Sequence, residues 1–339
     1  MNKLSIGLTF IFLSFLVQAD SDINNEAFSF IGFGVGEISY SESGILSSGV
    51  KFKTTPSTTN IFNQSGGYSP IGKKYGFYIN TLSTLTSSNS NEYWQALGTV
   101  TKGELSNSVD GIYQENVVSS SQNELHILLS YMFKPGHQVI AGGSYNKTLW
   151  DRNSFTNGED IDDFNNAHLT PAVGNEDVIG QGAEDLNNNG LLDLNELTSY
   201  YGVSPEDSIV NFTETFTSSV LQLGYFYDSR FIKNANKLRL IGGVSFGLPL
   251  YYSVNNTSRA QMEFTDSFNG YNLRGYAGIG WRFTKSIGVL AKFEYSYRTR
   301  DEVVVGLGYN EELQRERNAL IPENEIEYWN ASIVTTWNF

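Results

Sequence analysis

The amino-acid sequence predicts an all-β protein: a transmembrane, antiparallel, up-and-down β-barrel of about ten strands with long outer loops. Segments in the C-terminal half alternate apolar and polar residues with a period of two, as strands do when one face meets lipid and the other a polar lumen. The mean hydropathy of the 339-residue chain is only -0.27, although 14% of its residues are aromatic. A barrel combines these values because polar residues alternate with lipid-facing ones, whereas a helical membrane protein is far more hydrophobic.

Short and long connections also alternate along the chain. We place the short ones near residues 87–91, 134–137, 229–236 and 284–286, and the long ones near 41–74, 151–208, 255–271 and 301–325. Short turns on one side of a membrane and long loops on the other are typical of barrels that span it. Such barrels favour even strand numbers, so eight and twelve strands are the alternatives to ten. A soluble β-sandwich, the alternative fold, predicts no such order.

The N-terminus has the features of a signal peptide. Lys3 supplies a positive charge, the run from Ile6 to Val17 is almost wholly apolar, and small residues precede Asp20. Because the apolar run is shorter than the ~20 residues of a spanning helix, we expect cleavage after Ala19 rather than a membrane anchor. Residues 1–19 are then the signal peptide and residues 20–339 the barrel.

The chain has no cysteine and a formal net charge of -14, from 22 Lys and Arg against 36 Asp and Glu. The absence of cysteine excludes disulfide scaffolds, thiol catalysis and thiolate metal sites. The acidic balance argues against nucleic acid as a partner, because binding to nucleic acid depends on basic patches. It suits attraction for divalent cations.

In the N-terminal third, strands are expected near residues 27–40, 75–86 and 93–101. Residues 45–53 are the region in which a strand pair is most easily misplaced. Further along, the apolar residues Leu125, Ile127, Leu129, Tyr131 and Phe133 alternate with polar residues that include Glu124, His126 and Ser130. The turn Lys134-Pro135-Gly136 follows. The next strands are expected at 139–150, 219–228 and 238–250.

The last three strands are the clearest. Residues 272–283 and 287–300 are separated only by Thr284-Lys285-Ser286, which predicts a tight hairpin. In the final segment, 328–339, one face carries alternating apolar residues and ends on Phe339. This segment resembles the closing strand of bacterial outer-membrane β-barrels, whose terminal aromatic residue is recognised by the barrel-assembly machinery. The resemblance implies location in the outer membrane, with outer-membrane lipid and that machinery as partners.

The inward faces of these strands carry charges of both signs. The expected lumen charges are Glu124, Arg239, Arg274, Arg282, Lys292, Glu294, Arg298 and Arg300. A barrel of about ten strands is narrow enough for such side chains to fill it. We therefore expect a salt-bridged plug, with an ion-selective channel as the alternative.

The segment 151–207 is expected to be a long acidic surface loop, because it holds 13 acidic residues and one basic residue, Arg152. Within it, residues 185–196 satisfy the pattern D-x-[DN]-x-[DN]-G-x₅-E. This stretch resembles the twelve-residue calcium loop of the EF-hand family. A solvated acidic loop without metal is the alternative.

The EF-hand resemblance implies a Ca²⁺ ligand for each matching position. Side-chain oxygens would come from Asp185, Asn187, Asn189 and Asp193, the last directly or through water, with a backbone carbonyl from Leu191 and a bidentate carboxylate from Glu196. Gly190 stands where the family requires a sharp turn. No second loop is found to pair with this one, which favours a structural clamp of modest affinity, ~10⁻⁴–10⁻³ M.

Catalysis is not expected. The three histidines are His126, His137 and His168. Neither a His-x-Ser pairing, as in barrel phospholipases, nor an Asp-x-His pairing, as in barrel proteases, is present. His126 is expected to be a hydrogen-bonding residue of the lumen, in reach of Glu124 or Ser130.

The sequence therefore predicts a non-enzymatic outer-membrane barrel with a calcium-stabilised surface loop and a structural or surface-contact role. The alternative is a small porin whose acidic loop controls access of solutes. A barrel hydrolase and a soluble, lectin-like calcium-binding domain are further alternatives.

Overall fold

Ten antiparallel strands form a closed ring. The computed structural model describes residues 23–45, 50–102, 105–161, 163, 211–233, 237–257, 263–284, 286–310 and 315–338. In order around the ring the strands are β1 (Phe28–Ile45), β3 (Ser57–Pro70), β4 (Tyr75–Ser87), β6 (Leu105–Lys134), β7 (His137–Asn157), β8 (Phe212–Asp228), β9 (Leu238–Asn256), β11 (Tyr271–Arg282), β12 (Ile287–Arg300) and β15 (Glu323–Asn338). The predicted number of ten is confirmed for the described part of the chain.

The ring closes where the first and last strands meet. β1 pairs with β15 over a register that runs from Phe28 opposite Asn338 to Ser43 opposite Glu323. The backbones approach closely at this seam: a Cβ atom added to Gly36 would overlap the carbonyl oxygen of Trp329. A long pairing between the two ends of the described chain leaves the ring without an exposed edge.

The outer surface of the ring carries a belt of exposed apolar side chains. The belt includes Ile31, Phe33, Val35, Ile127, Leu129, Leu223, Val244, Ile279, Phe293 and Ile333. Aromatic residues border it on one side at Tyr75, Tyr225, Trp281 and Phe283, and on the other at Tyr145, Tyr251, Tyr271 and Tyr295. A soluble β-sandwich would bury such residues, whereas an apolar band between aromatic girdles is the surface of a barrel that spans a membrane.

The short connections lie at one end of the barrel, together with Phe28 and Asn338. They are residues 71–74, 135–136, 229–237 and 283–286. In the second of them Gly136 has φ of 79°, a conformation that favours glycine. The predicted short connections at 134–137, 229–236 and 284–286 are confirmed. We assign this end to the periplasm because periplasmic turns are short.

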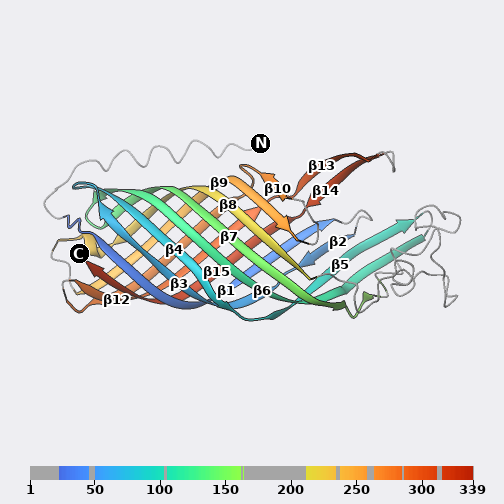
Figure 1. The fold of residues 1–339 in the computed structure, drawn as a ribbon, viewed down its shortest axis with the longest axis horizontal. Coiled ribbons are helices and arrows are strands. Elements are labelled where there is room, and N and C mark those ends of the chain that lie inside the picture. Colours follow the sequence, from blue (N-terminus) through green and yellow to red (C-terminus); the bar gives the residue numbers. More distant parts are fainter. Residues whose placement is uncertain are drawn as a thin grey trace.

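The opposite, outer end extends well beyond the ring (Figure 1). β2 (Lys51–Thr54) and β5 (Ser90–Lys102) continue the sheet outward between the end of β1 and the first half of β6. β10 (Glu263–Asp266) pairs with β9, and β13 (Val303–Asn310) pairs with β14 (Arg315–Ile321) as a separate hairpin. Residues beyond the outer aromatic girdle, among them Glu42, Arg152 and Glu214, lie outside the membrane.

Two sequence predictions are wrong in this outer region. The segment 93–101 was expected in the ring, but it belongs to β5 of the extension, so the connection at 87–91 lies at the outer end. The ring strand in its place is β3, which lies within the segment 41–74 that was predicted to be a loop. Asn63-Gln64-Ser65-Gly66-Gly67 gives β3 a polar, glycine-rich sequence that hides its alternation. The two errors compensate, which is why the strand number is still correct.

The predicted boundary of the acidic loop also changes. β7 continues to Asn157, so residues 151–157, including Arg152, are strand rather than loop. The expected signal peptide 1–19, the calcium loop 185–196 with its six ligands, and Phe339 lie outside the described residues. Within the described part of the chain, no helix is long and apolar enough to cross a membrane.

Candidate functional site: the packed lumen

An aromatic and aliphatic cluster fills the periplasmic end of the lumen. Its buried members are Phe28, Tyr68, Tyr78, Leu128, Met132, Ile140, Phe226, Phe231, Ile241, Leu290 and Val334. Phe231 is fully buried, with its ring centroid 4.9 Å from that of Tyr68 and 6.2 Å from that of Phe28. Side chains from nine strands and one turn thus meet across the mouth of the barrel and close it.

The turn that carries Phe231 is the short 3-10 helix η2 (Ser229–Phe231). Asp228 caps it, because its Oδ1 accepts a hydrogen bond from the backbone N–H of Arg230 at 2.9 Å. The same oxygen accepts from Arg239 Nε at 3.0 Å, which ties the cap to β9. The backbone N–H of Asn24 donates to the carbonyl of Phe231 at 2.9 Å. These bonds hold Phe231 inside the mouth.

A buried charge network lies midway along the lumen, around Glu124 on β6. Glu124 forms ion pairs with Arg298 and, at 3.4 Å, with Arg274. His126 Nε2 lies 2.9 Å from a Glu124 oxygen, and His126 Nδ1 lies 3.2 Å from the amide oxygen of Gln222. The network therefore bridges β6, β8, β11 and β12 across the lumen.

Glu294 on β12 forms the second centre of this network. It makes ion pairs with Arg274 and Lys292 and accepts a hydrogen bond from the hydroxyl of Tyr328. Lys292 also donates to the side-chain oxygen of Gln64 at 3.2 Å. The Glu294 side chain is only 1% exposed. Because buried charges are tolerated only when paired, the network fixes these side chains in the lumen.

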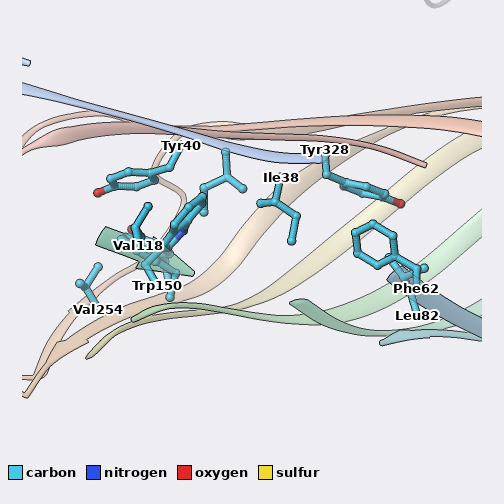
Figure 2. Close-up of a cluster of buried hydrophobic side chains, with 11 residues drawn as sticks. Ile38, Tyr40, Phe62, Leu82, Val118, Trp150, Val254 and Tyr328 are labelled. Atoms are coloured by element: carbon cyan, nitrogen blue, oxygen red, sulfur yellow. The ribbon is translucent and has the colours of Figure 1, made fainter. Parts of the chain in front are cut away.

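A second apolar cluster lies above the network, toward the outer end. Its buried members are Ile38, Tyr40, Phe62, Leu82, Val118, Trp150, Phe216, Tyr252, Val254, Ile326 and Tyr328. Figure 2 shows Tyr40, Val118, Trp150 and Val254 gathered at one end of this cluster and Phe62, Leu82 and Tyr328 at the other. The ring centroids of Tyr40 and Trp150 are 5.4 Å apart. The lumen is thus packed in alternating apolar and charged layers.

The outermost layer is an acidic cluster around Arg152 of β7. Arg152 Nε and Nη2 lie 2.7 and 3.0 Å from the two carboxylate oxygens of Glu92, and its Nη1 lies 2.6 Å from Glu214. A Glu42 oxygen is 4.0 Å from Nη2. The Arg152 side chain is 1% exposed. One guanidinium therefore joins carboxylates from β1, β5 and β8.

Glu42 differs from an ordinary surface carboxyl. Its burial, together with the nearby carboxylate of Glu214, raises its pKa to about 8, although Arg152 and a hydrogen bond from Tyr40 act in the opposite direction. The Tyr40 hydroxyl donates to Glu42 Oε2 at 2.8 Å. Glu42 is therefore largely protonated in the folded protein at neutral pH.

The structure brings most of the predicted lumen charges together. Glu124, Arg274, Lys292, Glu294 and Arg298 form one network, as the expected salt-bridged plug requires. The other three predicted charges are elsewhere: Arg239 pairs with Asp228 at the periplasmic mouth, Arg300 donates to Asn272, and Arg282 is half-buried at the periplasmic rim.

Two of the three histidines lie among the described residues. His126 contacts Glu124, as expected, and not Ser130. His137 lies at the periplasmic aromatic girdle, where its Nδ1 contacts the hydroxyl of Tyr225. His168 lies outside the described residues.

Sequence reasoning missed the cluster around Arg152, because that residue was assigned to the loop. The signal was present in the alternation of β7: Asn146, Thr148, Trp150 and Arg152 share one parity, and all four are buried. Among the described residues, no group of three or more His, Asp or Glu side chains is arranged to hold a metal ion.

No family model matches the chain, and no curated protein is significantly similar to it in sequence. Among solved structures, the outer membrane protease OmpT from Escherichia coli is similar with a TM-score of 0.58 at 10% identity, over 95% of this chain and 100% of that chain. The outer membrane protein OprG from Pseudomonas aeruginosa has a TM-score of 0.29 at 12% identity, over 95% and 99% of the two chains.

The likeness to OmpT is one of fold. The fold is that of an outer-membrane β-barrel, and the apolar belt between aromatic girdles is the surface with which such a barrel spans a membrane.

Proposed function

We propose that this protein is a non-enzymatic outer-membrane barrel, closed to solutes, whose role is structural or in surface contact at its outer end. The observation that carries the proposal is the filled lumen. Two apolar clusters and the network of Glu124 and Glu294 cross it at successive levels.

The energetics of the network support closure. A conducting pore keeps its charged groups in water, where an ion can exchange one hydration shell for another. Here the side chains of Glu124 and Glu294 are each 1% exposed and are neutralised by arginine and lysine from facing strands. Opening a path between them would separate buried ion pairs, which is costly.

The absence of catalysis is supported by the surroundings of His126. Both of its ring nitrogens are engaged, one by Glu124 and one by Gln222, and Arg274 lies against the ring. It therefore has no free nitrogen to act as a base toward a substrate.

The outer end offers a surface for contact. Strands β2, β5 and β6 extend it beyond the membrane, and the acidic segment between β7 and β8 joins it there. We propose that residues 185–196 of that segment bind Ca²⁺ through Asp185, Asn187, Asn189, Leu191, Asp193 and Glu196. The support is the contiguous match to the EF-hand loop, and the role would be to clamp the segment in one conformation.

The test is single-channel conductance of the refolded protein in a planar bilayer, first with calcium and then with chelator. Insertion without conductance in both conditions is expected. A double variant, Arg274→Ala with Glu294→Ala, removes two paired members of the network but leaves both apolar clusters in place, so it too should insert without conductance. A steady conductance of the wild type would contradict the proposal, and a change on chelation would identify a porin controlled by its acidic loop.

A further inference from the structure

A small cavity lies in the periplasmic half of the lumen, where the charge network meets the cluster that closes the mouth. Its volume is about 100 Å³. Four basic residues line it, His126, Arg239, Arg274 and Lys292, and no Asp or Glu side chain does. We infer that this cavity binds a small organic anion, a monocarboxylate with a short apolar chain. The inference goes beyond the proposed function, because a closed barrel can hold such a ligand.

The charge balance on both sides of the cavity supports an anion. On its outer side, three cations (Arg274, Lys292 and Arg298) share two carboxylates, Glu124 and Glu294. Three positive charges against two negative charges leave one positive charge in excess. Buried charge without a partner is unfavourable, and an anion in the adjacent space would offset it.

The periplasmic side of the cavity repeats this imbalance. Arg230 and Arg239 are both buried, and their one carboxylate partner among the described residues is Asp228. The cavity therefore lies between two groups of side chains, each with a net charge of plus one. A single monoanion in the cavity therefore stabilises both groups of side chains electrostatically.

Unpartnered donors at this end point to a carboxylate. Arg239 gives Nε and Nη2 to Asp228, but its Nη1 has no hydrogen-bond partner. Arg230 donates Nη2 to Thr336, which lines the cavity, while its Nε and Nη1 have none. The two guanidinium carbons lie 4.0 and 5.4 Å from the ring centroid of Phe28, another lining residue. Arginine N–H groups without a partner beside a cavity suit a carboxylate, whose two oxygens a guanidinium can bind bidentately.

The remaining wall residues indicate the size and polarity of the rest of the ligand. They are largely apolar, with Leu128, Phe226, Ile241 and Leu290 facing the space. A dry cavity of about 150 Å³ is known to take benzene, so a space of about 100 Å³ is large enough for a ligand of a few non-hydrogen atoms. A carboxylate with two or three further carbons fits both the size and the apolar walls.

The experiment is calorimetric titration of the refolded, full-length barrel in detergent micelles with butyrate. Butyramide, which has the same shape without the charge, and chloride are the comparison ligands. Butyrate should bind, butyramide should bind at least about tenfold more weakly, and chloride should not compete at equal concentration.

Two variants and one control locate the site. Arg239→Gln should weaken butyrate binding about tenfold or more, because a charge-assisted hydrogen bond is lost. Val334→Phe leaves every charge in place and should abolish binding by filling the cavity. Arg300→Gln is the control, since Arg300 is a buried lumen arginine that does not line the cavity, and it should bind as the wild type does.

Several results would overturn the inference: no butyrate binding by the wild type, equal affinity for butyramide, unchanged binding by Val334→Phe, or competition by chloride that indicates an adventitious ion only. Conductance of the same preparations separates this inference from the proposed function. A conducting wild type contradicts the closed barrel, whereas a non-conducting barrel without butyrate binding contradicts only the ligand site.

Discussion

Arg152 of β7 and Glu92 of β5 form a bidentate ion pair, with two guanidinium nitrogens 2.7 and 3.0 Å from the two carboxylate oxygens. The pair joins a strand of the ring to a strand that lies outside it. Thr54 of β2 and Asn116 of β6 donate to the same carboxylate at 3.0 and 2.8 Å. The extension is therefore attached to the barrel by a buried polar contact in addition to its backbone pairing.

Replacing Arg152 with alanine should loosen the extension. The change leaves Glu92 and Glu214 buried without their cation, which typically costs about 3–5 kcal/mol. We expect limited proteolysis to cleave β5 and the first half of β6 in the variant while the ring stays intact. Asp151→Asn, at an exposed position next to Arg152, is the matched control and should resist cleavage as the wild type does. Equal resistance in all three proteins would show that backbone pairing alone holds the extension.

Glu42 should make stability depend on pH in an unusual direction. Its folded pKa of about 8 lies above the ordinary value of 4.5, so between these values the folded protein keeps a proton that the unfolded chain loses. Stability should therefore fall as pH rises through this window, by up to about 1.4 kcal/mol per pH unit, and level off above pH 8. Below pH 4.5 both states are protonated, and the contribution is fully present.

The measurement is the free energy of unfolding by urea in detergent, at several pH values across this window, for wild type and Glu42→Gln. The variant cannot titrate at this position and should lose this part of the decline. Carboxyls far from Glu42 affect both proteins alike, so the difference between the two curves reports Glu42 and its interaction with Glu214 and Glu92. Parallel curves would contradict the raised pKa.

How much the sequence could predict depended on whether a strand contacts lipid along its length. β12 and the part of β15 from Tyr328 onward alternate apolar and polar residues because their outward residues meet lipid, and both were located correctly, whereas the first residues of β15 include glutamates at outward positions and were missed. β3 was missed because Asn63 and Ser65 stand at outward positions, where lipid would favour apolar residues. β5 was misplaced because its alternation reflects burial in the extension, which has the same period as burial in a lumen.

The candidate site shows the same limit. Parity identified the inward charges Glu124, Arg274 and Glu294 correctly, since a strand fixes which face a residue occupies. The alternation of faces along one strand does not determine which inward residues of two different strands lie at the same level of the lumen. That depends on the register between the strands. The partnership of Arg239 with Asp228, and the insertion of Phe231 into the mouth, depend on the conformation of η2 and could not be derived from alternation.

The calcium loop has a direct test. Glu196 is the expected bidentate ligand, so Glu196→Gln should abolish the protection of residues 158–211 from protease that calcium gives the wild type. Glu184→Gln removes an equal charge immediately before the loop and is the matched control, which should keep calcium-dependent protection. Protection is measured by the cleavage rate with calcium and with chelator. Equal rates in the wild type under both conditions would contradict the clamp.

The closing seam should be sensitive to a single methyl group. A Cβ at Gly36 would overlap the carbonyl oxygen of Trp329, a backbone atom of β15 that cannot move without separating the two strands. Gly36→Ala should therefore lower the free energy of unfolding by about 1–3 kcal/mol, the usual cost of overpacking.

The matched control for the seam is Gly143→Ala on β7, where the nearest atom to an added Cβ is the Val220 carbonyl oxygen at 3.7 Å, an ordinary contact. The measurements are the urea midpoint and the fraction of protein that keeps its folded mobility in unheated detergent gels. Gly36→Ala should show a lower midpoint and a smaller folded fraction than Gly143→Ala. If the two variants behave alike, the close approach of β1 and β15 does not limit closure of the barrel.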